Sequence, residues 1–420
     1  MDRITLIAVQ MSQHGPIVVI AINQSPSLTA ALTDAKLFPM VEVAWADASD
    51  AVARLLPAAI VAEMPAEGLD PLTRLANRLT THQPYVPLIL IDPTTRLPAN
   101  AIPLSALDSN PDRLGARLRA ALRVRSLHVT MLRRLADSPA LQGRLADSDP
   151  IQDATVLLIG RGASYPALSV ALGERMGIVG ALSIEAAAKH LNARDVDGIV
   201  IGDGFTPRVV DAFLTVLAED TRFRNLPVIV PARLTRGYDL PNLEMIAGDP
   251  VDVATNALPL IRQHAFEQRL VRTLRSIDAG GLLDPRTGLL TPTAFDRDFA
   301  KTIEQTLSRG AGLSVARFTL GDQPARVQYD AARIIGRLMR RTDFATMRDD
   351  GSIVAVFIGA SSRTAGSVAR RLASVVKHTV HSTKRDARVD PHVVVETLLP
   401  TDSAAMLLSR LDSDAHRAAS

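Results

Sequence analysis

The stretch TVLLIG (Thr155–Gly160) is the first of four short apolar runs that decide the fold of the middle of the chain. The others are IVGALSI (Ile178–Ile184), DGIVIGD (Asp197–Asp203) and LPVIVP (Leu226–Pro231). These runs are rich in β-branched residues, and the segments between them have the spacing of amphipathic helices. Near-continuous apolar strands that alternate with helices predict a parallel sheet covered by helices on both faces.

The same plan occurs once before in the chain, in the runs IVVIAI (Ile17–Ile22), VEVAWA (Val41–Ala46), AAIVAEM (Ala58–Met64) and PLILID (Pro87–Asp92). The sequence therefore predicts two tandem flavodoxin-like units, each a doubly wound parallel sheet of about 110 residues. A third α/β unit follows. We expect unit 1 at 1–125, a connector helix at 126–150, unit 2 at 151–262, a connector helix at 263–283 and the C-terminal unit at 284–420.

The composition excludes several classes of site. The 420 residues include no cysteine, which excludes disulfides, thiolate metal sites and a cysteine nucleophile, and fits a reducing compartment. No apolar run approaches the roughly 18 residues of a membrane-spanning helix. The first residues, MDRITLIAVQMSQHG, lack the pattern of a signal peptide. We therefore expect a cytoplasmic protein without a membrane span.

The charge is more informative in its distribution than in its total. A net charge of +3 over 420 residues does not indicate a nucleic-acid-binding protein. Residues 284–420 carry 20 basic and 15 acidic residues, whereas the rest of the chain is slightly acidic. The C-terminal third is therefore the expected location of a site for an anionic ligand.

Each of the first two units resembles the receiver domain of response regulators. That resemblance implies acidic residues after the first strand, a phosphoacceptor Asp after the third and a Lys after the fifth. The corresponding positions hold Asn23–Gln24 and Val61–Glu63 in unit 1, and Gly160–Arg161 and Gly202–Asp203 in unit 2.

These departures predict that both units are pseudo-receivers. Asp203 replaces the acceptor only if the register shifts by one residue. The first 283 residues contain only Lys36 and Lys189, and both lie in helical patterns. Without clustered carboxylates there is no oxygen cage for Mg²⁺. The alternative, an adaptor that responds to phosphorylation at Asp203, stays open.

Two further features of the sequence have more than one interpretation. GRGAS (Gly160–Ser164) has part of a dinucleotide-binding turn but lacks its third glycine, so a tight strand-to-helix turn is the preferred interpretation. In the second connector, Phe266, Leu270, Leu274 and Ile277 form one helical stripe. The stripe predicts packing against a neighbouring unit or a second copy of the chain.

DPRTGLLTPTAFDRDF (Asp284–Phe299) is the most specific string in the chain. It resembles the opening of a GGDEF (diguanylate cyclase) domain, and Asp284, Thr287, Gly288, Leu289 and Phe295 match that pattern in spacing. The pieces that follow, up to about Asp414, resemble the remaining elements of that domain in order. The whole chain thereby resembles the receiver–receiver–GGDEF family.

The signature itself has departed from the family. The five positions of the signature read Asp349, Asp350, Gly351, Ser352 and Ile353. Arg317 to Thr319 stand where the family ends its first strand with a second metal-binding Asp, and the segment before the hairpin is short. Two-metal phosphoryl chemistry needs carboxylates to hold the ions. We therefore expect no cyclase activity, no catalytic residue, no metal and no cofactor.

One further family element is present. Arg340-Arg341-Thr342-Asp343 stands at the position of the inhibitory R-x-x-D site, which in the family binds the product cyclic di-GMP. An Arg fork matches guanine O6 and N7, and a carboxylate accepts from the guanine N–H groups. The family also uses an Arg of the following helix, here Arg371, with Arg370 as the alternative. A solvated Arg-rich helix end is the competing interpretation.

The resemblance extends to PopA-type effectors, in which a degenerate GGDEF domain binds cyclic di-GMP and controls protein partners. It implies a signalling role in bacterial cell-cycle or polarity control, an unnamed protein partner, and homodimers formed through the fourth and fifth helical faces of receiver units. The alternative function is a protein-binding scaffold without a ligand. A metal site at His378, His381 and His392 lacks a fourth ligand, so a solvated connection is preferred.

Overall fold

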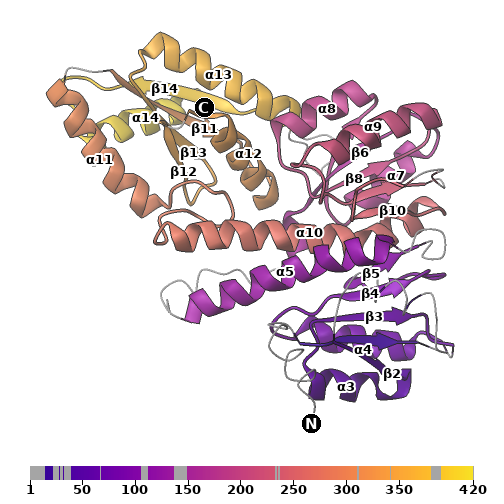
Figure 1. Cartoon of the computed structure of the whole chain (residues 1–420). Helices are drawn as coiled ribbons and strands as arrows, with labels where there is room; N and C mark the ends of the chain where they lie inside the picture. Colours follow the sequence, from indigo (N-terminus) through magenta and orange to yellow (C-terminus); the bar gives the residue numbers. More distant parts are fainter. Residues whose placement is uncertain are drawn as a thin grey trace.

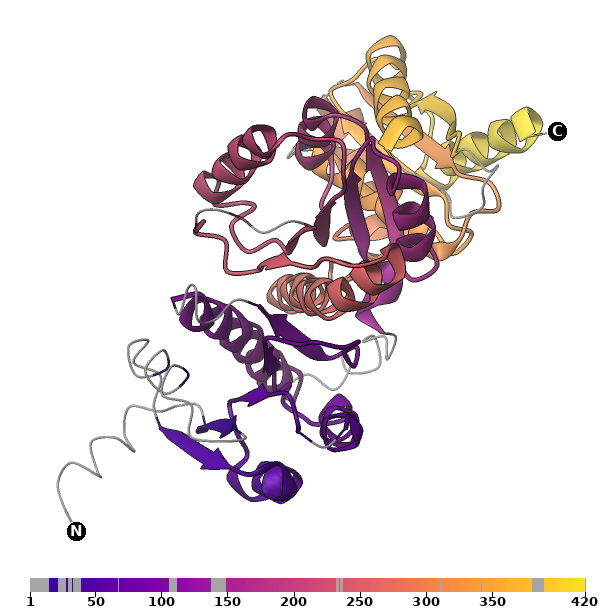
Figure 2. The ribbon, with the colours of Figure 1, turned by 90° about the vertical axis from the view of Figure 1, so that its right-hand side faces the viewer.

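The computed structural model describes residues 15–21, 28, 32, 39–66, 68–105, 112–136, 149–231, 234, 237–309, 312–340, 342–379 and 389–419. Three α/β units surround two long helices, α5 and α10, which lie side by side (Figure 1). Viewed from the side, the first unit, the second unit and the C-terminal unit follow one another along the molecule (Figure 2). The expected α/β class with two parallel sheets is confirmed.

The first unit is a five-stranded parallel sheet with the order β2-β1-β3-β4-β5. Alternate residues of its strands are buried on opposite faces, because helices cover both sides. Helices α3 and α4 cover one face, and α5 covers the other. The elements are β1 (Ile17–Ile20), β2 (Met40–Val43), η1 (Trp45–Asp47), α3 (Ala48–Leu55), β3 (Ala59–Glu63), α4 (Asp70–Thr80), β4 (Leu88–Ile91), β5 (Ala101–Leu104) and α5 (Asp112–Ala136).

The second unit repeats this topology as β10-β9-β8-β6-β7, which is again the flavodoxin-like order 2-1-3-4-5. Helices α8 and α9 cover one face of its sheet, and α7 and α10 cover the other. The elements are η2 (Pro150–Asp153), β6 (Thr155–Ile159), α7 (Tyr165–Gly173), β7 (Gly177–Ala181), α8 (Ile184–Ala193), β8 (Gly198–Ile201), α9 (Pro207–Glu219), β9 (Val228–Val230), β10 (Leu243–Met245) and α10 (Pro250–Asp278).

The C-terminal unit has a four-stranded antiparallel sheet with the order β12-β13-β11-β14. Helices α12 and α13 pack on one face, and α11 and α14 pack on the other. The elements are α11 (Pro292–Arg309), β11 (Leu313–Thr319), α12 (Ala325–Leu338), β12 (Phe344–Met347), β13 (Ile353–Ile358), α13 (Ser362–Thr379), β14 (His392–Thr397) and α14 (Ala404–Ala419).

The two expected connectors continue the last helices of their units without a break. Helix α10 runs as one element across the expected boundary at 262/263, and α5 runs across the boundary at 125/126. No turn signal interrupts either sequence, and Pro259 lies within α10 without ending it. No helix among the described residues has the length and apolar character that crossing a membrane requires.

The apolar stripe of α10 packs against α5, which decides between the two interpretations of the stripe. Phe266, Leu270, Leu274 and Ile277 join a small core with Val124, Leu127, Met131, Leu132 and Leu135 of α5. Phe266 also contacts the rings of Tyr85 and His128 at centroid distances of 5.5 and 5.2 Å. The stripe therefore joins the second unit to the first within one chain.

A buried ionic network fastens the first unit to the second. Glu244 of β10 accepts hydrogen bonds from Arg117 (2.9 Å) and Arg113 (3.2 Å) of α5, and from the backbone N–H of Ser105 (3.0 Å). The side chains of Arg117 and Glu244 are fully buried. Arg117 also donates to the carbonyls of Pro241 and Leu243. Because nearly all of the polar groups are paired, the network stabilises a fixed packing of the units.

This packing covers part of the surface through which homodimers were expected to form. The fifth helices, α5 and α10, and the strand ends beside them are buried against each other within one chain. In the first unit, residues 92–100 between β4 and β5 form no helix. The fifth helical faces of both units are therefore covered within one chain, and the first unit lacks a helix at its fourth position. Homodimerisation through another surface stays a prediction.

Candidate functional site

The DPRTG loop at the start of the C-terminal unit is held by its own side chains. Asp284 Oδ1 accepts from the backbone N–H groups of Arg286 (2.8 Å) and Thr287 (2.9 Å), which closes a tight turn. Gly288 has a φ of +75°, a conformation that favours glycine. Leu289 then enters the core against Gly336, where a Cβ atom would lie 2.7 Å from the leucine side chain. The turn and the packing of Leu289 therefore explain why Asp284, Gly288 and Leu289 stand at these positions of the motif.

The expected signature hairpin is formed by β12 and β13. Its turn is closed by hydrogen bonds from Arg348 N–H to the Ser352 carbonyl (2.8 Å) and from Gly351 N–H to the Arg348 carbonyl (2.9 Å). Gly351 has a φ of +77°. Asp349 and Asp350 occupy the tip of the turn and are exposed, whereas Ser352 and Ile353 are buried. Asp350 Oδ1 accepts from the backbone N–H (3.0 Å) and the hydroxyl (2.6 Å) of Ser352.

Arg317 brings a positive charge to this hairpin. From β11, its guanidinium forms ion pairs with Asp350 at the hairpin tip and with Asp412 of α14. Partial burial opposes ionisation of Asp350, but the Ser352 hydrogen bonds and the Arg317 charge outweigh it and lower the pKa of that carboxyl. Asp350 is thus ionised and paired with the Arg317 guanidinium.

The R-x-x-D residues lie in the turn between α12 and β12. Asp343 N–H donates to the Arg340 carbonyl (3.1 Å), and Asp343 Oδ1 accepts from Ile358 N–H (3.2 Å). Among the described residues, no donor is bonded to the other carboxylate oxygen, Oδ2. Arg340, Arg370 and Arg371 are exposed, and the Arg370 guanidinium lies over Gly366. Arg341 lies outside the described residues.

A pocket of about 740 Å³ lies beside this turn, and Asp343 is one of its lining residues. Arg340, Arg370 and Arg371 are not. The pocket is enclosed by α10, α11, α12, the edge of β12 and the DPRTG loop, with Asp195 of the second unit at its rim. Five basic and three acidic side chains line it: Arg272, Arg275, Lys301, Arg333, Arg337, Asp195, Asp298 and Asp343. The volume is that of a typical ligand site.

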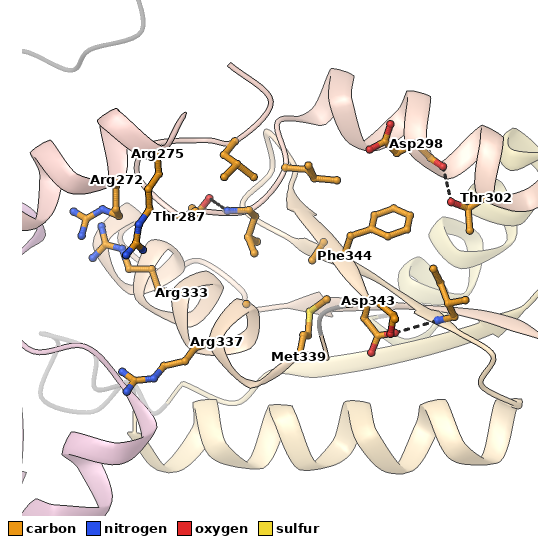
Figure 3. Close-up of a pocket in the computed structure, with 18 of the residues that line it drawn as sticks. Arg272, Arg275, Thr287, Asp298, Thr302, Arg333, Arg337, Met339, Asp343 and Phe344 are labelled. Carbon is orange, nitrogen blue, oxygen red and sulfur yellow. Dashed lines mark hydrogen bonds between the residues drawn. The ribbon is translucent and has the colours of Figure 1, made fainter. Parts of the chain in front are cut away.

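The four arginines gather at one end of this pocket, and Asp343 lies apart from them (Figure 3). Arg272 and Arg275 are three residues apart on α10, and Arg333 and Arg337 are four apart on α12, so each pair shares a helix face. We call Arg272, Arg275, Arg333 and Arg337 the arginine cluster.

The arginine cluster lacks enough anionic partners. Burial, followed by the charge of Arg333, lowers the pKa of Arg272 to about 10. The Arg333 guanidinium donates through Nε to the Arg286 carbonyl (2.7 Å), while its buried Nη2 has no hydrogen-bond partner among the described residues. Buried guanidinium groups with incomplete pairing favour the binding of an anion.

One loop of the second unit holds the C-terminal unit against it. Arg194, which is 2% exposed, forms an ion pair with Asp330 of α12, and the next residue, Asp195, pairs with Arg337 at 2.6 Å. Asp197 of the same loop accepts from Thr155 N–H (2.9 Å) and lies 3.5 Å from His264 of α10. Asp195 and Arg337, which join the two units, also line the pocket.

Asp203 lies in the loop that follows β8 in the second unit. Its carboxylate accepts from the hydroxyl (2.6 Å) and the backbone N–H (3.3 Å) of Ser164, at the start of α7. The Ser164 hydroxyl bond is the main cause that lowers the pKa of Asp203. GRGAS forms a tight turn closed against Asp203, because a Cβ atom on Gly162 would lie 2.2 Å from that carboxyl group.

The sequence predicted an anionic site within residues 284–420 but did not identify the arginine cluster, two members of which lie before that range. Arg272 and Arg275 belong to the connector, and Arg333 and Arg337 belong to a helix with an ordinary amphipathic pattern. The two arginine pairs at helical spacing were a visible signal, yet only the fold makes them face each other. Among the described residues, no three metal-ligating side chains cluster, and His378 and His392 are exposed. His381 lies outside the described residues.

No family model matches the chain, and no curated protein matches it significantly. The solved structures similar to part of it include two GGDEF domains and a diguanylate cyclase. The GGDEF domain of DgcB from Caulobacter crescentus in complex with c-di-GMP is 15% identical, covers 31% of this chain and 84% of its own, and has a TM-score of 0.29. The FimX GGDEF domain from Pseudomonas aeruginosa is 18% identical, with coverages of 33% and 93% and a TM-score of 0.30. Diguanylate cyclase SiaD in complex with its activator SiaC, also from P. aeruginosa, is 18% identical, with coverages of 36% and 64% and a TM-score of 0.31.

Proposed function

We propose that this protein is a non-catalytic receptor for cyclic di-GMP and that ligand binding controls its association with a protein partner. The observation that carries the proposal is that one pocket is lined by Asp343 of the R-x-x-D motif and, at its other end, by the arginine cluster. A guanine dinucleotide needs both parts: acceptors for its base N–H groups, and cations for its two phosphates.

The chemistry of the pocket suits this ligand. In the proposed complex, Asp343 accepts from guanine N1–H and the N2 amine, and Arg340 donates its fork to O6 and N7 of the base. Arg272 and Arg333 lie on the side of the pocket away from Asp343 and supply the positive charge for phosphate. Arg340, and Arg371 or Arg370 of α13, complete the site only after side-chain movements, because none of them lines the pocket now.

The absence of catalysis is the second half of the proposal. Arg317 occupies the position of a metal-binding Asp in the family that the sequence resembles, and its guanidinium pairs with Asp350. A cation fixed on a side chain neutralises the carboxylate that remains at the hairpin, so it disfavours the binding of Mg²⁺ there.

Ligand binding is proposed to act by population shift. The pairs Arg194–Asp330 and Asp195–Arg337 hold the C-terminal unit on the second unit, and Asp195 and Arg337 also line the pocket. A ligand that binds the docked arrangement more tightly than an undocked one shifts the population toward the docked arrangement. The size of the shift is set by the difference between the two affinities. The docked state then presents one fixed surface to a partner.

Titration calorimetry with cyclic di-GMP tests the proposal. We expect micromolar binding to the wild type, about −8 kcal/mol, and at least a tenfold loss in Arg340→Ala and in Asp343→Asn. The Asn side chain retains the acceptor for Ile358 N–H, so that variant separates recognition of guanine from the structural role of Asp343. Arg363→Ala, an exposed position on α13 outside the pocket, is the matched control. Absence of binding to the wild type favours the alternative, a scaffold without a ligand.

A further inference from the structure

A second cavity, of about 170 Å³, lies where the first unit meets α10. It lies at the start of β4 and β5, far in sequence from the R-x-x-D turn, and shares no lining residue with the arginine-lined pocket. The site is therefore independent of the function proposed above. Its walls are formed by Leu79, Thr80, Tyr85, Val86, Ala99, Asn100, Pro150, Pro259, Arg262, Gln263 and Phe266.

The walls are mostly apolar, and aromatic rings form part of them. Tyr85 and Phe266 pack edge to face with an interplanar angle of 66°. Pro259 belongs to the wall on α10 and has no backbone N–H to donate there. An apolar cavity of about 150 Å³ is large enough to bind benzene. The dimensions therefore fit one six-membered ring with a small substituent.

Three side chains give the cavity a donor character. Gln263 is 7% exposed, and its amide nitrogen Nε2 has no hydrogen-bond partner among the described residues. Burial raises the pKa of Tyr85 above its ordinary range, although the nearby charge of Arg262 and the Gln263 side chain beside the hydroxyl oppose the rise, so the Tyr85 hydroxyl stays protonated. Arg262 donates through Nε to Asp149 at 2.9 Å. A buried amide without a partner is rare in a native structure and points to a missing acceptor.

We propose that this cavity binds a small aromatic carboxylate of the size of benzoate. The ring fills the space between Tyr85, Phe266 and Pro259, and the carboxylate accepts from Gln263 Nε2 beside the positive charge of Arg262. Such a ligand contacts the first unit and α10 at once, so it stabilises their packing.

Fluorine NMR with 4-fluorobenzoate on the full chain, in the absence of any nucleotide, tests this assignment. We expect saturable binding to the wild type and a thermal unfolding midpoint that rises with ligand concentration. Gln263→Leu keeps the volume but removes the donor, and we expect at least a tenfold weaker binding. Ala99→Trp, at an exposed position on the rim, is expected to abolish binding by filling the cavity.

The controls decide between a specific site and general association. Gln152→Leu changes an exposed amide on η2 outside the cavity and is expected to bind like the wild type. The neutral probe 4-fluorobenzamide is expected to bind more weakly than the carboxylate. No saturable binding to the wild type, equal binding by Gln263→Leu and Ala99→Trp, or equal binding of the two probes would overturn the assignment. Circular dichroism of each variant excludes loss of the fold as the cause.

Discussion

Arg317 and Asp350 form an ion pair between strand β11 and the tip of the β12–β13 hairpin. The same guanidinium also pairs with Asp412 of α14, so two carboxylates share one side-chain cation. Asp350 lies in the stretch that resembles a catalytic signature, and the pairing gives it a structural role. The hairpin is thereby tied to the strand beside it and to the last helix.

The first prediction concerns catalysis at this hairpin. Incubation of the protein with GTP and Mg²⁺ is expected to yield no linear or cyclic dinucleotide by chromatography, because no carboxylate pair is free to hold the ions. The variant Arg317→Asp is also expected to be inactive, since Gly351 and Ser352 supply no carboxylate. An active diguanylate cyclase assayed in parallel is the control. Any dinucleotide formed by the wild type refutes the proposal of a non-catalytic receptor.

The second prediction concerns the interface between the first two units. Glu244→Ala leaves the buried Arg117 guanidinium without its counter-charge, and removing one partner of a buried pair typically costs about 3–5 kcal/mol. The free energy of unfolding of these units, measured with urea, is expected to fall by that amount. Glu304→Ala, at an exposed position on α11, is the control, with an expected change below about 0.5 kcal/mol. Equal stability of the two variants would show that Arg117 does not need Glu244.

The third prediction compares two ion pairs that dock the C-terminal unit. Asp330→Asn leaves Arg194 charged and buried, since Arg194 Nε and Nη1 already lack partners among the described residues. Small-angle X-ray scattering is expected to show a larger radius of gyration as the unit undocks. Arg337→Ala breaks the exposed pair with Asp195 and is expected to change the radius little.

A double variant sharpens this third test. Arg194→Met with Asp330→Leu removes both charges and replaces them with apolar groups of similar volume. It is expected to recover the compact form, because replacing a buried ion pair by packed apolar residues is often neutral or stabilising. A compact Asp330→Asn variant, or an expanded double variant, contradicts the assigned role of the pair.

The fourth prediction concerns pH. The folded-state pKa of Asp203 is lowered, chiefly by the Ser164 hydroxyl. Its contribution to stability is therefore present above the ordinary aspartate pKa and is lost as the pH falls through the lowered value. Ser164→Ala is expected to raise the pKa of Asp203 toward its ordinary value, as measured by carbon-13 NMR titration of the carboxyl. Ser169→Ala, on the same helix, should leave the titration unchanged.

The fifth prediction concerns phosphorylation. Acetyl phosphate with Mg²⁺ is expected to leave Asp203 unlabelled in mass spectrometry, because its carboxylate is bonded to Ser164 and no metal-ligating cluster occurs in the described part of the chain. A working receiver domain serves as the positive control. Labelling at Asp203 would restore the alternative of a phosphorylation-responsive adaptor.

The sequence carried enough local information to predict the class of fold. The β-branched runs around Thr155–Gly160 and Ile17–Ile22 fixed the strands, because a strand buried on both faces must be apolar along its whole length. The resemblance to the GGDEF domain also predicted the signature hairpin, which β12 and β13 form, and the R-x-x-D segment before it. The turn formed by Asp284 and Gly288 is also predictable from the sequence, since the interactions that stabilise it lie within five residues.

Which distant charges meet depends on the packing of the whole chain and is not visible in the sequence. Arg117 with Glu244, Arg194 with Asp330, and Arg317 with Asp350 and Asp412 are joined across 33 to 136 positions of the chain, and no periodicity relates such partners. The arginine cluster likewise arises because α10 and α12 face one pocket. Short-range patterns specify strands, helices and turns, whereas burial and the pairing of charge depend on how those elements pack.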